Sequence, residues 1–553
     1  MTPSGTDKRR QRAAAPRRPE RRTSPWNLAA PLLVAITAIA TYAPALSFQF
    51  LNWDDNLYVL SNPWIRAWSS ENLAHIFTKP YSANYLPLHL VSYMVDYSVW
   101  GLNPFGYHLQ SILLHALNSV LALVVVRRML GSSTVAFLAA LFFAVHPSHV
   151  EAVAWISIRK DLLSTAFALL TVTFYLRATS MPSIRWAPYI ASFIFFTLGL
   201  LSKVTVVTLP LFLLLLDRFK PEGQPRNPWI RDLASKIPYA LVGLGLVWWN
   251  TLAQSKASAP YARDALSYAM VKGHAVWNYL GLLIGVLRGS PDYDLPVLGR
   301  DALTVLVSLA GLALFPAATW LAYRFRNRPV FLGLAWIFVA LLPALAFPLV
   351  TYMADRYLYA PSLGFCWLVA SGIVGLSGRV AAPRWRTAAV IGMSLVPFAG
   401  FTARTLQSLP VWRDSESLWT YAITRCQDFR AYTNLAEVRL GRNRWDEAER
   451  LLRISARVDN PTTYQNFAVL YYELGRYPEA VSAIDRALAI LKQQGWDPAL
   501  ASVLYYNLGA IHWKLEQKDK TIEALEAALR EDPSNAQARE QLRLAQESAA
   551  APP

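Results

Sequence analysis

Long apolar segments recur through the first three quarters of this chain, and they constrain its fold more than any other feature. A membrane-spanning helix needs about 20 mostly apolar residues. Only 16% of the residues are charged, against about 25% in an average soluble protein. Eleven segments meet or nearly meet the required length, near 27–47, 109–127, 134–146, 161–177, 186–202, 204–217, 237–254, 301–322, 329–350, 358–377 and 386–403. The sequence therefore predicts an all-α, polytopic helical membrane domain of about 11 spans over residues 26–405.

The charges between these segments predict the orientation, because short cytoplasmic loops are enriched in Lys and Arg. With a cytoplasmic N-terminus, the basic loops fall inside, at 127–128, 177–185, 217–236, 324–328 and 379–386. This scheme requires the additional apolar segment 271–288 not to span, so we expect an interfacial or re-entrant helix on the outer face. If 271–288 does span, Arg324, Arg326 and Arg328 move outside, against the charge rule.

Residues 1–25 are rich in Arg, Pro and Ala, which predicts a disordered basic cytoplasmic arm. A nucleic-acid-binding tail is a weaker alternative, because the arm directly precedes an apolar span whose orientation it would set. Cleavage of the first apolar segment as a signal peptide at 43–45 is another alternative, and the long preceding arm argues against it. We expect no nucleic-acid partner.

Beyond residue 404 the charged residues become frequent and the long apolar runs stop. Three stretches, at 432–461, 464–487 and 508–533, place small and aromatic residues at similar spacings. Small residues let two antiparallel helices approach closely, and aromatic residues fill the groove between them. The stretches resemble tetratricopeptide repeats. We expect a tetratricopeptide-repeat α-solenoid over 406–545, whose concave face binds a protein or peptide, and a disordered tail over 546–553.

Polar and charged side chains gather in four loops that the topology places on the outer face. Charges at a membrane boundary are costly, so each is a candidate functional residue. The candidates are Asp54 and Asp55; His146, His149 and Glu151, followed by Arg159, Lys160 and Asp161; Lys203; and Asp355, Arg356 and Tyr357. Four loops that deliver such groups to one side predict a single polar cavity that opens outward.

The residue types in these loops limit the chemistry. A carboxylate can deprotonate a hydroxyl group, and Arg or Lys can neutralise a departing phosphate. The sequence contains neither a glycine-rich nucleotide-binding loop nor a serine nucleophile elbow. Transfer of a sugar from a lipid phosphate to a hydroxyl needs only these functions, and an outer site has no supply of nucleotide sugar. His146, His149 and Glu151 form a weak zinc pattern, so we expect them to form hydrogen bonds; a divalent metal is not supported.

The motifs together resemble those of a known family. They read Asn52-Trp-Asp-Asp, His146-Pro-Ser-His-Val-Glu, Leu201-Ser-Lys and Asp355-Arg-Tyr-Leu-Tyr-Ala-Pro-Ser. The chain resembles bacterial relatives of the transmembrane and tetratricopeptide-repeat O-mannosyltransferases, which are GT-C-type glycosyltransferases near the protein O-mannosyltransferases. The resemblance implies that Asp54 is the catalytic base and Asp55 the second acidic residue. It also implies an inverting reaction and a dolichyl- or polyprenyl-phosphate sugar donor. Residues 84–88 lack the arginine that is frequent in the family before Pro-Leu.

These observations lead to one functional hypothesis. An integral protein of the bacterial cytoplasmic membrane, with its repeats outside, moves mannose or a similar hexose from a polyprenyl phosphate to a Ser or Thr hydroxyl of a protein. Arg356, Lys203, Arg159 and Lys160 hold the donor phosphate; His146, His149, Glu151, Asp161, Asp355 and Tyr357 line the cavity. Its partners are membrane lipids, the lipid-linked sugar and an acceptor protein bound by the repeats. The alternatives are a non-catalytic repeat scaffold in the membrane, transfer to a lipid or glycan acceptor, and transport of a lipid-linked sugar.

Overall fold

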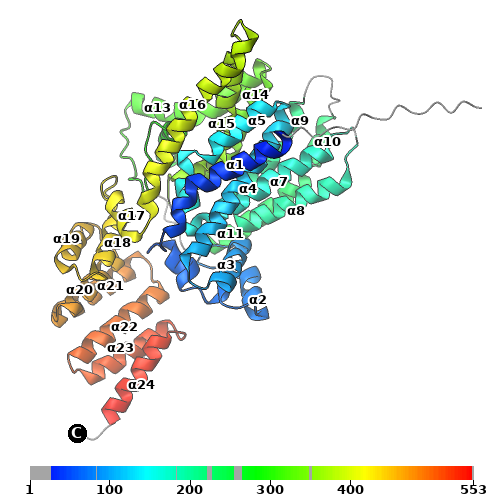
Figure 1. Ribbon diagram of the computed structural model, residues 1–553. Coiled ribbons are helices and arrows are strands. Elements are labelled where there is room, and N and C mark those ends of the chain that lie inside the picture. Colours follow the sequence, from blue (N-terminus) through cyan, green and yellow to red (C-terminus); the bar gives the residue numbers. More distant parts are fainter. Residues whose placement is uncertain are drawn as a thin grey trace, which may run out of the picture.

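The computed structural model describes residues 26–82, 84–181, 183–220, 227–254, 264–347 and 351–550. These residues form helices and no β-strand, in agreement with the all-α prediction. The predicted basic arm lies outside the described residues. A membrane part formed by the first sixteen helices is followed by an elongated repeat part, which extends away from it at the lower left of Figure 1.

The membrane part begins with α1 (Trp26–Tyr42) and a short 3-10 turn, and two small helices follow, α2 (Ser70–Thr78) and α3 (Pro87–Trp100). The longer apolar helices are α4 (Pro104–Leu130), α5 (Ser133–Ala144), α7 (Arg159–Ala178), α8 (Trp186–Ser202), α9 (Leu209–Arg218), α11 (Ile237–Gln254), α12 (Ala265–Ile284), α13 (Ala302–Arg324), α14 (Arg328–Ala346), α15 (Pro361–Ser377) and α16 (Pro383–Ser408). Short helices α6 (Val150–Ala154) and α10 (Trp229–Ala234) lie between them.

The chain is a membrane protein by the length and composition of these helices. Six of the described helices, with their adjoining short turns, could each cross a bilayer, and a seventh crossing results if α5 and the segment 147–154 form one span bent by 51°. Three shorter apolar helices occur as well, at 186–202, 237–253 and 361–377. The eleven predicted segments coincide with helices wherever the structure describes them, but the number of 11 spans remains a prediction.

Two opposite sides of the membrane part can be defined by contacts between helix ends. Arg328, at the start of α14, donates to the carbonyl of Met129 at the end of α4 and to that of Phe219 after α9, the latter at 2.9 Å. We call this the far side. On the other side, which we call the repeat side, the Gln49 amide after α1 donates to the Arg413 carbonyl before the repeats, at 2.9 Å.

Helix α12 lies along the repeat side. Near its start, the Lys272 ammonium donates to the Ala344 carbonyl at the end of α14, at 2.7 Å. Near its end, the Leu283 carbonyl lies 3.0 Å from Nε2 of His146, just beyond α5. Both ends of α12 therefore contact helix ends on the same side of the bundle. This geometry supports an interfacial helix rather than a span for 271–288.

The repeat part consists of antiparallel helix pairs. A linker helix α17 (Ser415–Ala422) precedes the pairs α18–α19 (Phe429–Leu440, Trp445–Ser455), α20–α21 (Pro461–Glu473, Tyr477–Gln494) and α22–α23 (Pro498–Lys514, Lys518–Glu531), and α24 (Ala536–Ala550) follows. Small residues stand where helices approach closely; a Cβ on Gly509 would lie 2.9 Å from Leu525. Helix α24 continues beyond the predicted domain end at 545, so residues 546–550 are helical.

Candidate active site

The first loop on the repeat side contains two adjacent aspartates, Asp54 and Asp55, whose surroundings differ. Asp55 is buried, and its carboxylate accepts the Leu51 and Ser157 amides at 3.0 Å each, together with the Ser157 hydroxyl. Burial raises the pKa of Asp55 to about 6. Asp54 is only half-buried, and in the described part of the chain no hydrogen bond or ion pair involves its carboxylate. Asp55 thus anchors the loop, while the Asp54 carboxylate remains partly accessible.

A second element of the site is a buried ion pair between two distant segments. Glu151 on α6 pairs with the Arg356 guanidinium and accepts the Arg356 amide at 2.7 Å. The guanidinium carbon also lies 5.7 Å from the Trp155 ring centroid and 5.2 Å from that of Tyr357. Glu151 is 1% exposed and Arg356 retains 13%, so the arginine is held firmly while part of it remains accessible.

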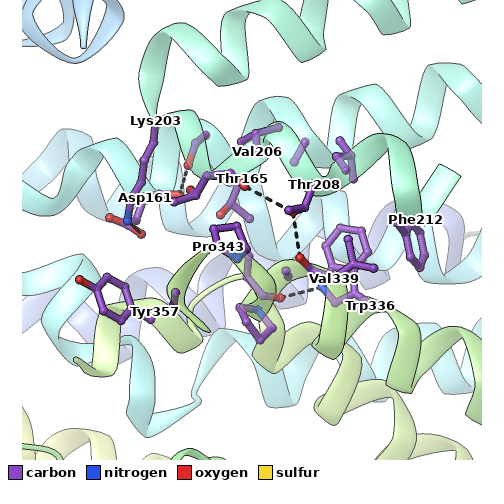
Figure 2. Close-up of a pocket in the computed structure, with 18 of the residues that line it drawn as sticks. Asp161, Thr165, Lys203, Val206, Thr208, Phe212, Trp336, Val339, Pro343 and Tyr357 are labelled. Atoms are coloured by element: carbon purple, nitrogen blue, oxygen red, sulfur yellow. Dashed lines mark hydrogen bonds and ion pairs between the residues drawn. The ribbon is translucent and has the colours of Figure 1, made fainter. Parts of the chain in front are cut away.

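A third element joins α7 to the end of α8. The Lys203 ammonium lies 2.6 Å from the Asp161 carboxylate, and the two side chains point toward each other in Figure 2. The same ammonium lies 5.5 Å from the Tyr357 ring centroid. Tyr357 therefore stands between the two cations, Lys203 and Arg356.

One cavity contains both of these cations and continues into an apolar groove. Its polar end is formed by Asp161, Lys203, Arg356 and Tyr357, and its apolar walls include Val206, Leu209, Phe212, Trp336 and Val339. Figure 2 shows the apolar residues extending away from the Lys203–Asp161 pair. The groove leaves about 660 Å³ of space, counted with its open mouth. Its shape suits a molecule with a charged head and an apolar tail.

Lys160 links this cavity to the first loop. Its ammonium lies within electrostatic range of Asp54 and also of Lys203, Asp161 and Arg356. It stands 5.1 Å from the Tyr58 ring centroid, on the loop that follows Asp54. The candidate base and the cationic end of the cavity are therefore neighbours.

Several predicted site residues lie elsewhere. Arg159 was expected to hold phosphate, but it is fully buried, pairs with Asp96 on α3 and donates to the Tyr107 carbonyl at 2.8 Å. It does not line the cavity, so the structure does not place it where it could grip the donor. The Asp96 partner was missed, although a single carboxylate in an otherwise nearly uncharged helix was a usable signal.

The two histidines are buried in the interior rather than in the cavity wall. His146 lies 2.8 Å from the Ser148 hydroxyl, and His149 lies 2.6 Å from the Ser362 hydroxyl on α15. The bond from His146 to Ser148 is local, whereas that of His149 reaches α15; both residues were predicted to line the cavity with the other polar groups, and neither lies in its wall. Within the described ranges, no three His, Cys, Asp or Glu side chains gather in a way that could hold a metal ion.

Asp355 belongs to a different cavity from its neighbour Arg356. It accepts the Tyr293 hydroxyl and lines a smaller cavity with Arg288 and Arg404. Burial, followed by repulsion from Glu151, raises its pKa to about 8. Asp355 was predicted to line the same cavity as the other polar residues, but it lines the smaller one, because successive side chains of its 3-10 turn diverge by about 120°.

Comparison with known proteins shows which sequences this chain resembles. The profile of the dolichyl-phosphate-mannose-protein mannosyltransferases matches residues 90–249, and two tetratricopeptide-repeat profiles match residues 462–493 and 503–535. Protein O-mannosyl-transferase Tmtc1 of Drosophila melanogaster is 27% identical over 67% of this chain, and human protein O-mannosyl-transferase TMTC4 is 25% identical over 72%. The chain is similar to these protein O-mannosyl-transferases. It spans 53% and 62% of the length of these two relatives.

Solved structures give a looser match. The crystal structure of ArnT from Cupriavidus metallidurans bound to undecaprenyl phosphate is 17% identical, with a TM-score of 0.39 over 84% of this chain and 80% of that one. The Archaeoglobus fulgidus oligosaccharyltransferase, tethered with an acceptor peptide, is 13% identical with a TM-score of 0.38, over 76% and 58% of the two chains.

Proposed function

We propose that this protein transfers mannose or a similar hexose from a polyprenyl-phosphate donor to a Ser or Thr hydroxyl of a protein. The observation that carries the proposal is the groove with apolar walls and a cationic end, next to the unpaired carboxylate of Asp54. The names of the relatives, all protein O-mannosyl-transferases, point to the same reaction class.

The groove accounts for both halves of the donor. Burial of an isoprenoid chain against residues such as Phe212 and Val339 would be favourable by about 25 cal/mol per Å². The phosphate would lie against Lys203 and Arg356, which can share its negative charge. Lys160 is a third cation, within electrostatic range of Asp54. Arg159 is paired with Asp96 and is not among the residues that would hold the phosphate.

The transfer step uses Asp54 and these cations in sequence. The Asp54 carboxylate takes the proton of the acceptor hydroxyl while the hydroxyl oxygen forms a bond to the anomeric carbon. The bond from that carbon to the phosphate oxygen breaks, and the phosphate retains the electron pair. Arg356 and Lys203 neutralise the charge that develops there. Attack opposite to the leaving group inverts the anomeric centre, and no nucleotide takes part.

The orientation and domain boundaries belong to the same proposal. The far side carries the basic loops, which favours the cytoplasm for that side and the exterior for the repeat side. The chain would lie in the cytoplasmic membrane, with a basic cytoplasmic arm (1–25), a GT-C-like domain (26–405) and external repeats (406–545) that bind the acceptor protein. A non-catalytic scaffold would not need the groove and the unpaired carboxylate together.

Reconstitution of the purified protein tests the proposal. In vesicles with a synthetic acceptor peptide, transfer should occur from polyprenyl-phosphate mannose and not from a nucleotide sugar alone. Asp54→Asn should remove the activity, while Asp519→Asn, a charge-matched change on the exposed surface of α23, should retain it. Efficient use of the nucleotide sugar would overturn the mechanism. Transfer to lipid in place of peptide would establish the alternative acceptor.

A further inference from the structure

A further polar recess lies on the far side, where the ends of five helices meet. Five cations line it: Arg128 from α4, Arg177 from α7, Arg185 before α8, Lys220 after α9 and Arg328 from α14. It leaves about 860 Å³ of space, counted with its open mouth. None of the residues assigned to sugar transfer lines this recess.

The recess has a strong excess of positive charge. Asp217 is its single carboxylate among the described residues, and the ammonium of Lys236 lies 2.6 Å from it. That buried ion pair compensates the charge of Asp217 within the protein. Among the described residues that line the recess, no other carboxylate balances the five cations.

Two of the five cations have an ordinary structural role, and three do not. Arg328 donates to the carbonyls of Phe219 and Met129 and so caps two helix ends, and Arg128 donates to the carbonyl of Thr173 within α7. For the side chains of Arg177, Arg185 and Lys220, the described residues provide no carboxylate or carbonyl partner. Arg177 is also close enough to Arg128 for the two to repel each other.

The preference for Lys and Arg on the cytoplasmic side explains why these residues are positively charged. It does not explain why their side chains line the same recess. Charges that only orient the chain could point separately into water. Here they come from five different helix ends and line one recess. Like charges held together in this way are stabilised by an anion that binds between them, and a tetrahedral phosphate can accept hydrogen bonds from several donors at once.

We propose that the far-side recess binds a phosphate group, with Arg177, Arg185 and Lys220 as the residues that recognise it. The phosphate belongs either to the headgroup of an anionic phospholipid or to a soluble phosphorylated molecule. The recess opens at the end of the apolar helices, and Leu176 and Leu216 contribute to its wall.

Thermal unfolding of the full-length protein in detergent, titrated with three probes, tests this site. The probes are dihexanoyl phosphatidylglycerol, dihexanoyl phosphatidylcholine and glycerol 3-phosphate. The triple variant Arg177→Gln/Arg185→Gln/Lys220→Gln is compared with Arg379→Gln/Arg384→Gln/Arg386→Gln. The control removes the same charge from the loop after α15 and from the first turn of α16, outside the recess. Both variants spare Arg128 and Arg328, so their hydrogen bonds to backbone carbonyls remain.

An increase in Tm with phosphatidylglycerol but not phosphatidylcholine is expected for the wild type and the control. The recess variant should require on the order of a hundredfold more phosphatidylglycerol for the same increase, because each cation near a membrane contributes several-fold to anion affinity. An equal response to glycerol 3-phosphate would identify a soluble ligand as the source of the phosphate. The proposal fails if neither phosphate probe raises the Tm, or if both triple variants respond equally.

Discussion

The indole nitrogen of Trp419 donates a hydrogen bond to the Asn52 side-chain oxygen at 2.6 Å, two residues before Asp54. Trp419 lies on α17, at the entry to the repeats, and Asn52 also donates to the Asn434 carbonyl on α18 at 3.2 Å. The adjacent Trp53 stacks on Trp155, with ring centroids 4.2 Å apart. The loop that carries the proposed base is thus held between the membrane part and the repeat part.

This contact predicts that the repeats influence the chemical step. Trp419→Phe removes the hydrogen bond but keeps an aromatic ring. If the bond positions the loop, its loss should raise the activation free energy by about 1 kcal/mol and lower turnover about fivefold. The reaction should be measured with a short peptide, so that loss of acceptor binding to the repeats does not contribute. Trp513→Phe, on exposed α22, is the matched control. Equal turnover for the two variants would show that the contact is only structural.

The two neighbouring aspartates should differ in phenotype. Asp54→Asn removes the proton acceptor, and turnover should fall by about 10²–10⁴-fold with little change in donor affinity or stability. Asp55→Asn turns an amide NH₂ toward the Leu51 or Ser157 amide, so it should lower the free energy of unfolding by about 1–3 kcal/mol. Kinetics and thermal unfolding of both variants are required. If Asp55→Asn abolishes turnover in a fully stable protein while Asp54→Asn is active, the base is Asp55.

The Glu151–Arg356 pair should be tested as a pair. Removal of one partner leaves a buried charge and should cost about 3–5 kcal/mol of stability. The double variant Glu151→Gln/Arg356→Gln should recover much of that stability. It should still show a raised KM for the lipid donor and slower transfer, because the cation at the cavity end is missing. Arg356→Lys should rescue only partly, since a point charge cannot hold phosphate through two hydrogen bonds. Wild-type kinetics in the double variant would remove Arg356 from donor binding.

Because the pKa of Asp355 is raised, we predict that the stability of the protein falls as the pH rises. Its folded pKa, about 8, lies above the ordinary value near 4, so the folded state binds a proton that the unfolded state releases. The stability contributed by this bound proton is complete below the unfolded-state pKa, near 4, and is lost as the pH rises through about 8. Asp355→Asn mimics the protonated side chain. Its Tm relative to wild type should increase from pH 5 to pH 8.5; a constant difference would contradict the assignment.

Reporter fusions test the orientation. A reporter that is active only outside the cytoplasm should give a signal when fused after residue 405 and none at residue 325, which follows α13 on the far side. A signal at 325 would mean that 271–288 crosses the bilayer. That result would contradict the contacts of α12 with the repeat-side ends of α5 and α14.

The sequence predicted the parts of this molecule that depend on local patterns. Apolar length located the helices, and small residues at repeat spacing located the α20–α21 and α22–α23 pairs. Side-chain direction was harder. Arg159 and Lys160 are adjacent in the sequence, yet one faces Asp96 on α3 and the other faces Asp54 and the cavity. The same holds for Asp355 and Arg356, because each pair sits at a turn whose direction depends on tertiary packing.

The stacked tryptophans beside the first loop give the protein an intrinsic optical signal. Trp53 contacts Trp155 and Trp419, and the ring of Trp155 also lies 5.7 Å from that of Trp412. Indoles this close share their electronic excitation, so their near-ultraviolet circular dichroism depends on their mutual angles. Any displacement of the loop or of α17 would alter that spectrum. Movement of this loop can thus be followed in unlabelled protein by circular dichroism.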